Sequence, residues 1–139
     1  MPTTTPKGIA KFSGGTDPVN VATLIQSADD VDAALAGAWQ TLTLSASWVA
    51  LSGFVTPRYR LEAGGTLVRV EAVIQSGNTT GTTVFATLPA GFRPAATTPV
   101  LLADGNNAHA RFTVTTGGAL TIQSGFSATA TSIAVTFGL

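Results

Sequence analysis

Residues 64–74 read GGTLVRVEAVI, a pair of glycines followed by a long alternating run. In an extended chain, successive side chains point to opposite faces. One face of this run then carries only apolar side chains, namely Val68, Val70, Ala72 and Ile74. Alternation of this kind is typical of a strand with one buried face. The stretch therefore predicts a β-strand that begins after a glycine turn.

A second strand is predicted at residues 83–87, TVFAT, and it leads directly into residues 88–94, LPAGFRP. Proline fixes the backbone angle at Pro89 and Pro94, and Gly91 permits a tight turn between them. The passage contains no catalytic pattern. The passage is therefore expected to support the fold, and this favours a binding or structural role for the protein.

Most of the remaining chain has the same period of two. Alternating runs occur at residues 39–44, 48–51, 58–62, 100–102, 110–115, 119–123 and 132–137, with turn clusters between them. Parallel strands would need crossover helices, and no helical pattern connects these runs. The sequence predicts an all-β fold, an antiparallel, jelly-roll-like β-sandwich head over residues 38–139. Apolar residues at predicted outward positions, Leu67, Val73 and Phe85, indicate contact between subunits.

The first 37 residues follow a different pattern. Residues 1–17 are rich in Thr, Pro and Gly, which predicts an extended anchoring arm that orders on a partner. Asp17 and Pro18 begin a predicted helix over residues 18–37, and Gly37 ends it. Its apolar residues recur at steps of three and four, at Val21, Leu24, Ala28, Val31 and Leu35. This seam fits packing against the head or, as we favour, an oligomer formed through the helix.

The composition excludes several classes of function. Charged residues make up 10% of the chain, against about 25% in ordinary soluble domains. Residues 1–37 hold two lysines and four aspartates, and the remainder holds five arginines and three acids. Neither part has the basic patch that nucleic-acid binding requires. Polar residues interrupt every long uncharged stretch, so we expect no membrane insertion.

Groups suited to catalysis or metal binding are few. The sequence has no cysteine and a single histidine, His109. Glu62, Glu71 and Asp104 are the only acids after residue 37, and Glu71 lies two residues from Arg69 on the same strand face, where an ion pair is expected. We therefore predict a protein without enzymatic activity, bound metal or cofactor.

Candidate receptor-binding residues fall in two groups, Arg58, Tyr59 and Arg60 in a strand and Asn106, Asn107 and His109 around a turn. The first group suits an anionic sugar or a phosphate, with the tyrosine as a stacking face. The second suits hydrogen bonds to a saccharide. Each group also has a structural interpretation. The first would be a sheet-edge strand whose arginines are solvated or paired across strands, and the second an ordinary turn. Trp39 and Trp48 alternate with apolar residues and are predicted to lie in the core or at an interface.

The order of these motifs resembles that of virion-surface proteins of tailed phages. In many tail-fibre and receptor-binding proteins, an arm and a trimerising helix precede a β-sandwich head with comparable motifs. The matching elements are residues 67–74, the glycine-rich turn 77–81, the strand and corner 84–94, and the strand 118–122. The stretches 5–8, 16–19 and 29–32 also resemble the beginning of small minor tail proteins of phages infecting actinobacteria.

The resemblance implies a structural virion protein, assembled in the host cytoplasm and located on the tail or capsid surface. It implies a homotrimer whose arm, residues 1–17, docks onto other virion proteins and whose head recognises a host cell-wall saccharide as a small tail fibre. Several weak sites displayed together would supply avidity. The alternative is a trimeric capsid decoration protein or head fibre, stapled to the capsid by the same arm.

Overall fold

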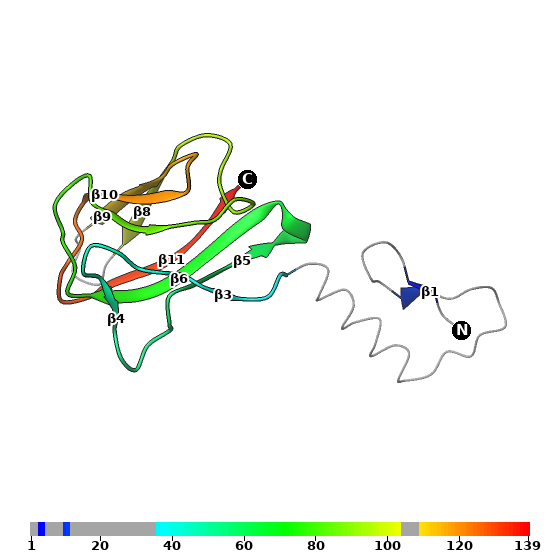
Figure 1. The fold of residues 1–139 in the computed structure, drawn as a ribbon, viewed down its shortest axis with the longest axis horizontal. Coiled ribbons are helices and arrows are strands. Elements are labelled where there is room, and N and C mark those ends of the chain that lie inside the picture. The colour runs from blue at the N-terminus through cyan, green and yellow to red at the C-terminus, as the bar shows by residue number, and fades with distance from the viewer. Residues whose placement is uncertain (1–2, 5–9, 12–35, 104–108) are drawn as a thin grey trace.

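The computed structural model describes residues 3–4, 10–11, 36–103 and 109–139. Two antiparallel sheets face each other across a layer of apolar side chains, which confirms the predicted antiparallel β-sandwich (Figure 1). Residues 18–35 of the predicted helix over 18–37, which include its seam, lie outside the described residues, as do Asn106 and Asn107. Ala36 forms an isolated antiparallel bridge with Glu62 instead of a helical turn. Nowhere in the described ranges is there a helix with the length and apolar character needed to cross a membrane.

One sheet, here called the β6 sheet, is centred on the alternating run that opens the sequence argument. Its strands are, in spatial order, β11 (Thr131–Gly138), β6 (Leu67–Gln75), β5 (Arg58–Glu62) and β3 (Gln40–Thr41), while β4 (Val49–Ala50) pairs with the end of β6. The glycine turn before β6 contains the short 3₁₀ element η1 (Ala63–Gly65). Gly64 and Gly65 have positive φ there, as the predicted glycine turn requires.

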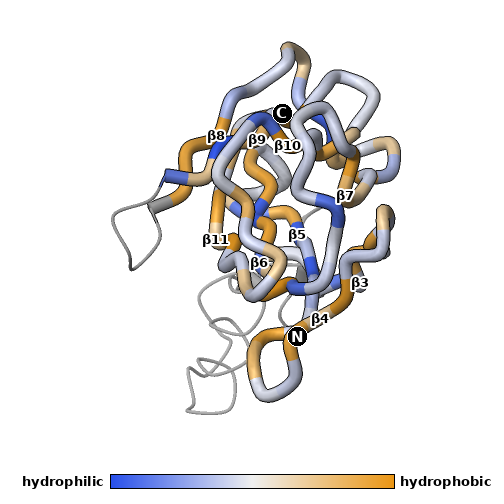
Figure 2. Tube along the Cα trace, turned by 90° about the vertical axis from the view of Figure 1, so that its left-hand side faces the viewer, coloured by the Kyte–Doolittle hydropathy of each residue, from blue (hydrophilic) through white to orange (hydrophobic). Residues whose placement is uncertain are grey.

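The second sheet, here called the β9 sheet, covers the first. Its strands are, in spatial order, β7 (Val84–Thr87), β10 (Ala119–Ser124), β9 (His109–Val114) and β8 (Thr98–Ala103). Two further short strands, β1 (Thr3–Thr4) and β2 (Ala10–Lys11), pair with each other inside the segment predicted to be an arm. Hydrophobic residues concentrate in the strands of both sheets, and the loops between them are mostly more polar (Figure 2).

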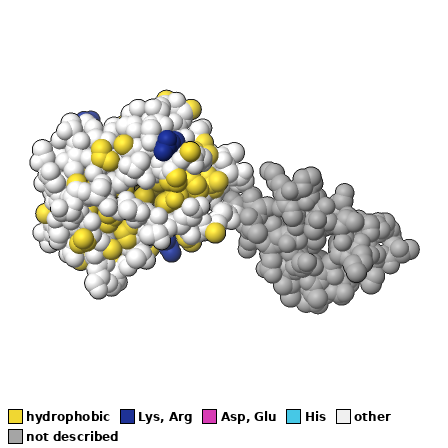
Figure 3. Space-filling view, viewed as in Figure 1, with side chains coloured by type: hydrophobic (Ala, Val, Ile, Leu, Met, Phe, Trp, Pro, Cys, Tyr) yellow, Lys and Arg dark blue, Asp and Glu magenta, His cyan; other side chains and the backbone are white. Residues whose placement is uncertain are grey.

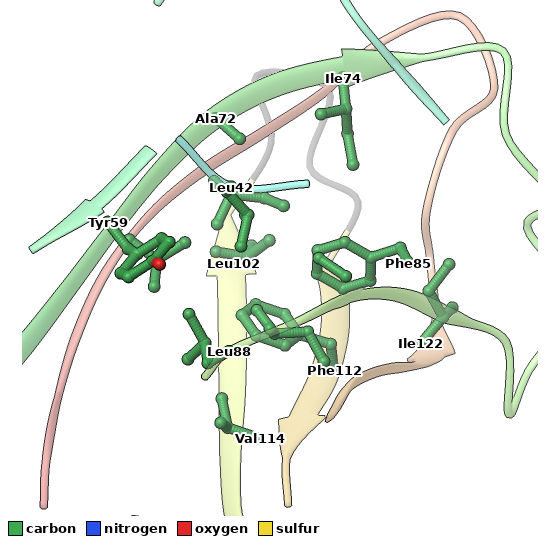
Figure 4. Close-up of a cluster of buried hydrophobic side chains, with 14 of the residues drawn as sticks. Leu42, Tyr59, Ala72, Ile74, Phe85, Leu88, Leu102, Phe112, Val114 and Ile122 are labelled. Carbon is green, nitrogen blue, oxygen red and sulfur yellow. The ribbon is translucent and has the colours of Figure 1, made fainter. Parts of the chain in front are cut away.

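The core lies between the two sheets. Val68, Val70, Ala72 and Ile74 of β6 are all completely buried, as the alternation predicts. On the inner face of the β9 sheet, the rings of Phe85 on β7 and Phe112 on β9 meet edge to face with centroids 5.4 Å apart (Figure 4). Trp48 is also buried, which confirms its predicted place in the core.

Two predictions are corrected, one about a residue and one about a strand. Phe85 does not face outward but is fully buried, because the register between β7 and β10 shifts at this residue. Ala86 pairs with Leu120 and Val84 with Thr121, so Phe85 is the extra residue of a bulge and turns inward. The run 39–44 is not one strand, since it leaves the β6 sheet after β3 and pairs with β7 through Leu44.

The corner after β7 ties the two sheets together. Its arginine, Arg93, donates a hydrogen bond from Nε to the Leu88 carbonyl oxygen at 2.9 Å, and the Leu88 N–H donates to the Gly118 carbonyl oxygen at 2.8 Å. Phe92 packs edge to face against Tyr59 of the β6 sheet, with centroids 4.8 Å apart. The corner motif and the later glycine at position 118 therefore belong to one structural unit, although 24 positions separate Gly118 from Pro94.

Candidate functional site

The outer face of the β6 sheet gathers charged side chains around one tryptophan. Along β5, Tyr59 points into the core while Arg58 and Arg60 point outward. Trp39 immediately precedes β3, the neighbouring strand. The guanidinium carbons of Arg58 and Arg60 lie 4.1 and 4.3 Å from the centroid of the Trp39 ring. Two cations therefore stack on a single indole, an arrangement that cation–π attraction stabilises.

The adjacent strand β6 adds an acid and a third arginine. Glu71 pairs in register with Arg58, and Arg69 pairs with Arg60. The Glu71 carboxylate accepts hydrogen bonds from Arg58 Nη2 at 2.8 Å and from Arg69 Nε at 2.7 Å. The predicted ion pair between Glu71 and Arg69 is thus confirmed. We call this group the Trp39 cluster, and its members are Trp39, Arg58, Arg60, Glu62, Arg69 and Glu71.

Glu62 completes the cluster from the end of β5. Its Oε1 accepts hydrogen bonds from Arg60 Nη2 at 2.8 Å and from Arg60 Nε at 3.1 Å. The cluster therefore holds three arginines and two glutamates, which leaves a surplus of one positive charge on this face.

The two contacts with arginine determine the protonation of Glu71. Hydrogen bonds from Arg58, and then from Arg69, hold the pKa of Glu71 below its ordinary value, although partial burial acts in the opposite direction. Glu71 is therefore ionised at neutral pH and is unsuited to donate a proton. The chemistry that the cluster offers is recognition of a planar or anionic group by guanidinium.

Replacing Glu71 with glutamine is expected to lower the free energy of unfolding at neutral pH by about 1 kcal/mol, because two charge-assisted hydrogen bonds are weakened at a partly solvated site. A carboxyl group whose pKa is lowered by folding stabilises the protein fully above its unfolded pKa of about 4.3. That stabilisation disappears as the pH falls through the lower pKa of the folded state. Urea unfolding should therefore show the stabilities of wild type and Glu71→Gln converging in acid.

Glu62→Gln is the matched control for this experiment. Within the described part of the chain, Arg60 alone contacts the Glu62 carboxylate, whereas two arginines contact Glu71. We therefore expect the Glu62 variant to lose less stability at neutral pH. A difference between wild type and Glu71→Gln that stayed constant down to the acid limit would contradict the assignment of this ion pair.

The other predicted site residues are distributed over both sheets. Tyr59 is buried, and its hydroxyl donates to the Gln40 Oε1 at 3.1 Å. The ring expected to stack on a ligand is thus occupied by Phe92. His109 is exposed at the start of β9 and belongs to the opposite sheet. The structure therefore brings Arg58 and Arg60 together and places His109 on a different face.

Trp39 was not identified from the sequence as a member of this cluster. Trp39 is half-buried on the outer face and is therefore not in the core, while the predicted alternative of an interface stays a prediction. A signal was present, because Arg58 and Arg60, like Arg69 and Glu71, are spaced by two and so share one strand face. What the sequence did not supply was the register that aligns these strands. Elsewhere the surface is mostly uncharged, and in Figure 3 apolar patches and a few basic side chains interrupt it.

The fold places the chain in the class of antiparallel β-sandwich proteins. No protein-family model matches the chain, and no curated protein matches it significantly. Among solved structures, it is similar to the receptor binding protein (gp15) of Listeria phage PSA, with a TM-score of 0.55 and 19% sequence identity. The similarity covers 88% of this chain and 82% of that protein. At this identity the comparison shows a shared fold.

Proposed function

We propose that this chain is a non-enzymatic structural protein of a tailed-phage virion that acts as a small tail fibre or receptor-binding head. The observation that carries the proposal is the shared fold with a phage receptor binding protein, over 88% of this chain and 82% of the other. The corner and strand motifs that resemble tail-fibre heads support the same conclusion independently of the comparison.

The proposal includes a homotrimer and a saccharide on the host surface. The apolar seam of residues 21–35 supports self-association, and residues 1–17 would dock onto other virion proteins. The resemblance to minor tail proteins favours an actinobacterial host. In a trimer, three copies of a shallow site on the head would bind together, so modest single-site affinity gives strong attachment.

Binding to cells tests this function. The full chain, labelled with a fluorophore, is expected to bind saturably to bacteria on which the corresponding phage grows, and excess unlabelled chain is expected to displace it. Treating the cells with protease should leave binding intact, whereas periodate oxidation of their sugars should abolish it. Absence of saturable binding to any susceptible strain would rule out the receptor-binding function.

A further inference from the structure

The Trp39 cluster has the composition of a site for a singly charged anion. We propose that it binds an acidic saccharide, a sugar carrying one oxyanion, through the guanidinium groups of Arg58 and Arg60. The proposal rests on the receptor-binding function and names the ligand class of that function. Its basis is the surplus of one positive charge among three arginines and two glutamates.

The arginines retain donors that the described contacts do not use. Both hydrogen bonds from Arg58 go to a single oxygen, Oε2 of Glu71, and both from Arg60 go to Oε1 of Glu62. In each case Nε and Nη2 are the donors, and a guanidinium carries five N–H groups. Among the described residues, Nη1 of each arginine makes no hydrogen bond, and it can therefore serve an external oxyanion. The side chains are accessible, with 38% of Arg58 and 27% of Arg60 exposed.

Trp39 holds the two guanidinium groups in place. They lie 4.1 and 4.3 Å from the centroid of the same ring, so both are restrained by one side chain before any ligand arrives. Each guanidinium also pairs with a glutamate, so the indole and the two carboxylates together stabilise the two positive charges. A ligand that brings one negative charge to the cluster neutralises its surplus positive charge, and little side-chain entropy is lost because the arginines are already ordered.

The same arrangement limits which ligands fit. The carboxylates of Glu62 and Glu71 lie beside the arginines. They would repel a highly charged anion more strongly than an anion with a single charge. The Trp39 ring is occupied by guanidinium groups and does not offer the open aromatic face on which a neutral sugar would stack. Charge recognition combined with hydrogen bonds from a planar fork is therefore favoured over stacking.

Nuclear magnetic resonance titration of the full chain with D-glucuronate and with D-glucose tests the site. The two sugars are matched in size and differ in charge. Glucuronate is expected to shift the indole N–H of Trp39 and the Nε–H signals of Arg58 and Arg60, and the shifts should weaken as sodium chloride is raised. Glucose should leave these signals unchanged.

Three variants locate the interaction. Arg60→Gln should weaken glucuronate binding about tenfold, because one charge-assisted hydrogen-bonding group is lost, and Arg60→Lys should recover only part of it since the planar fork is missing. Arg111→Gln removes an exposed arginine from the outer face of the β9 sheet, and it should bind as wild type does. Unchanged thermal unfolding of each variant would show that the fold is intact.

The outcomes separate this inference from the proposed function. Wild type that binds host cells but shows no glucuronate shift at Trp39, or an equal shift with glucose, would overturn the acidic-saccharide site and leave receptor binding standing. Equal weakening by Arg60→Gln and Arg111→Gln would also overturn it, since the effect would then come from overall charge. Specific shifts with glucuronate in a protein that does not bind cells would support the site and reject the function.

Discussion

Replacing Phe112 with alanine is expected to lower the free energy of unfolding by about 3–5 kcal/mol. Its side chain is completely buried between the sheets, where its ring meets Phe85 and Phe126 with centroids 5.4 and 6.2 Å away. Truncation removes this aromatic packing and leaves a cavity that two hydrogen-bonded sheets cannot collapse to fill. The loss should be visible as a large fall in the urea midpoint.

Phe54→Ala is the matched control, because it makes the same chemical change at an exposed site. The Phe54 side chain is 63% exposed in the loop between β4 and β5, so its truncation should change stability by no more than about 0.5 kcal/mol. Comparable losses from both variants would contradict the assignment of Phe112 to the core.

The second large effect is expected from Gly118→Ala. Gly118 has a φ of +86°, and a Cβ there would clash with the Leu88 carbonyl oxygen and lie 2.8 Å from Arg93 Nε. The substitution has two costs. The strained backbone costs about 1–2 kcal/mol, and displacement of the corner, which the Arg93 hydrogen bond closes, costs about 1–3 kcal/mol. We expect a total loss of about 3 kcal/mol in urea unfolding.

Gly91→Ala separates these two costs. Gly91 has a φ of +91° in the same corner, but a Cβ there would meet no atom within 4 Å. Its substitution should therefore cost only the backbone strain of about 1–2 kcal/mol. If Gly118→Ala proved no worse than Gly91→Ala, the close packing of the corner against Gly118 would be refuted.

Much of the fold was predictable from sequence because it depends on local alternation. The buried face of β6 follows directly from the period of two, and the glycine turn before it follows from the backbone freedom of Gly64 and Gly65. The corner was recognised as structural from its prolines and its glycine. Its actual closure uses the side chain of Arg93 and the space at Gly118, and that contact between distant segments has no local sequence signal.

The errors share a physical cause, which is the pairing between strands. A bulge in β7 turns Phe85 inward, and no local pattern indicates where a register shifts. The candidate residues Arg58 and Arg60 were predicted to lie in one strand, and the structure places both on the outer face of β5. Their partners Trp39, Arg69 and Glu71 come from two adjacent strands, so the cluster becomes evident only when the sheet is assembled.

The location of this chain in virus particles tests the central claim most directly. Under the proposed function, gold-labelled antibodies against the chain, applied to intact particles of a tailed phage whose genome carries this sequence and viewed by electron microscopy, are expected to mark the tail alone. Density confined to the tail would agree with a tail fibre or receptor-binding head. Label spread over the capsid shell would contradict that role and indicate the decoration protein, and particles without label would show that the chain is not a virion component.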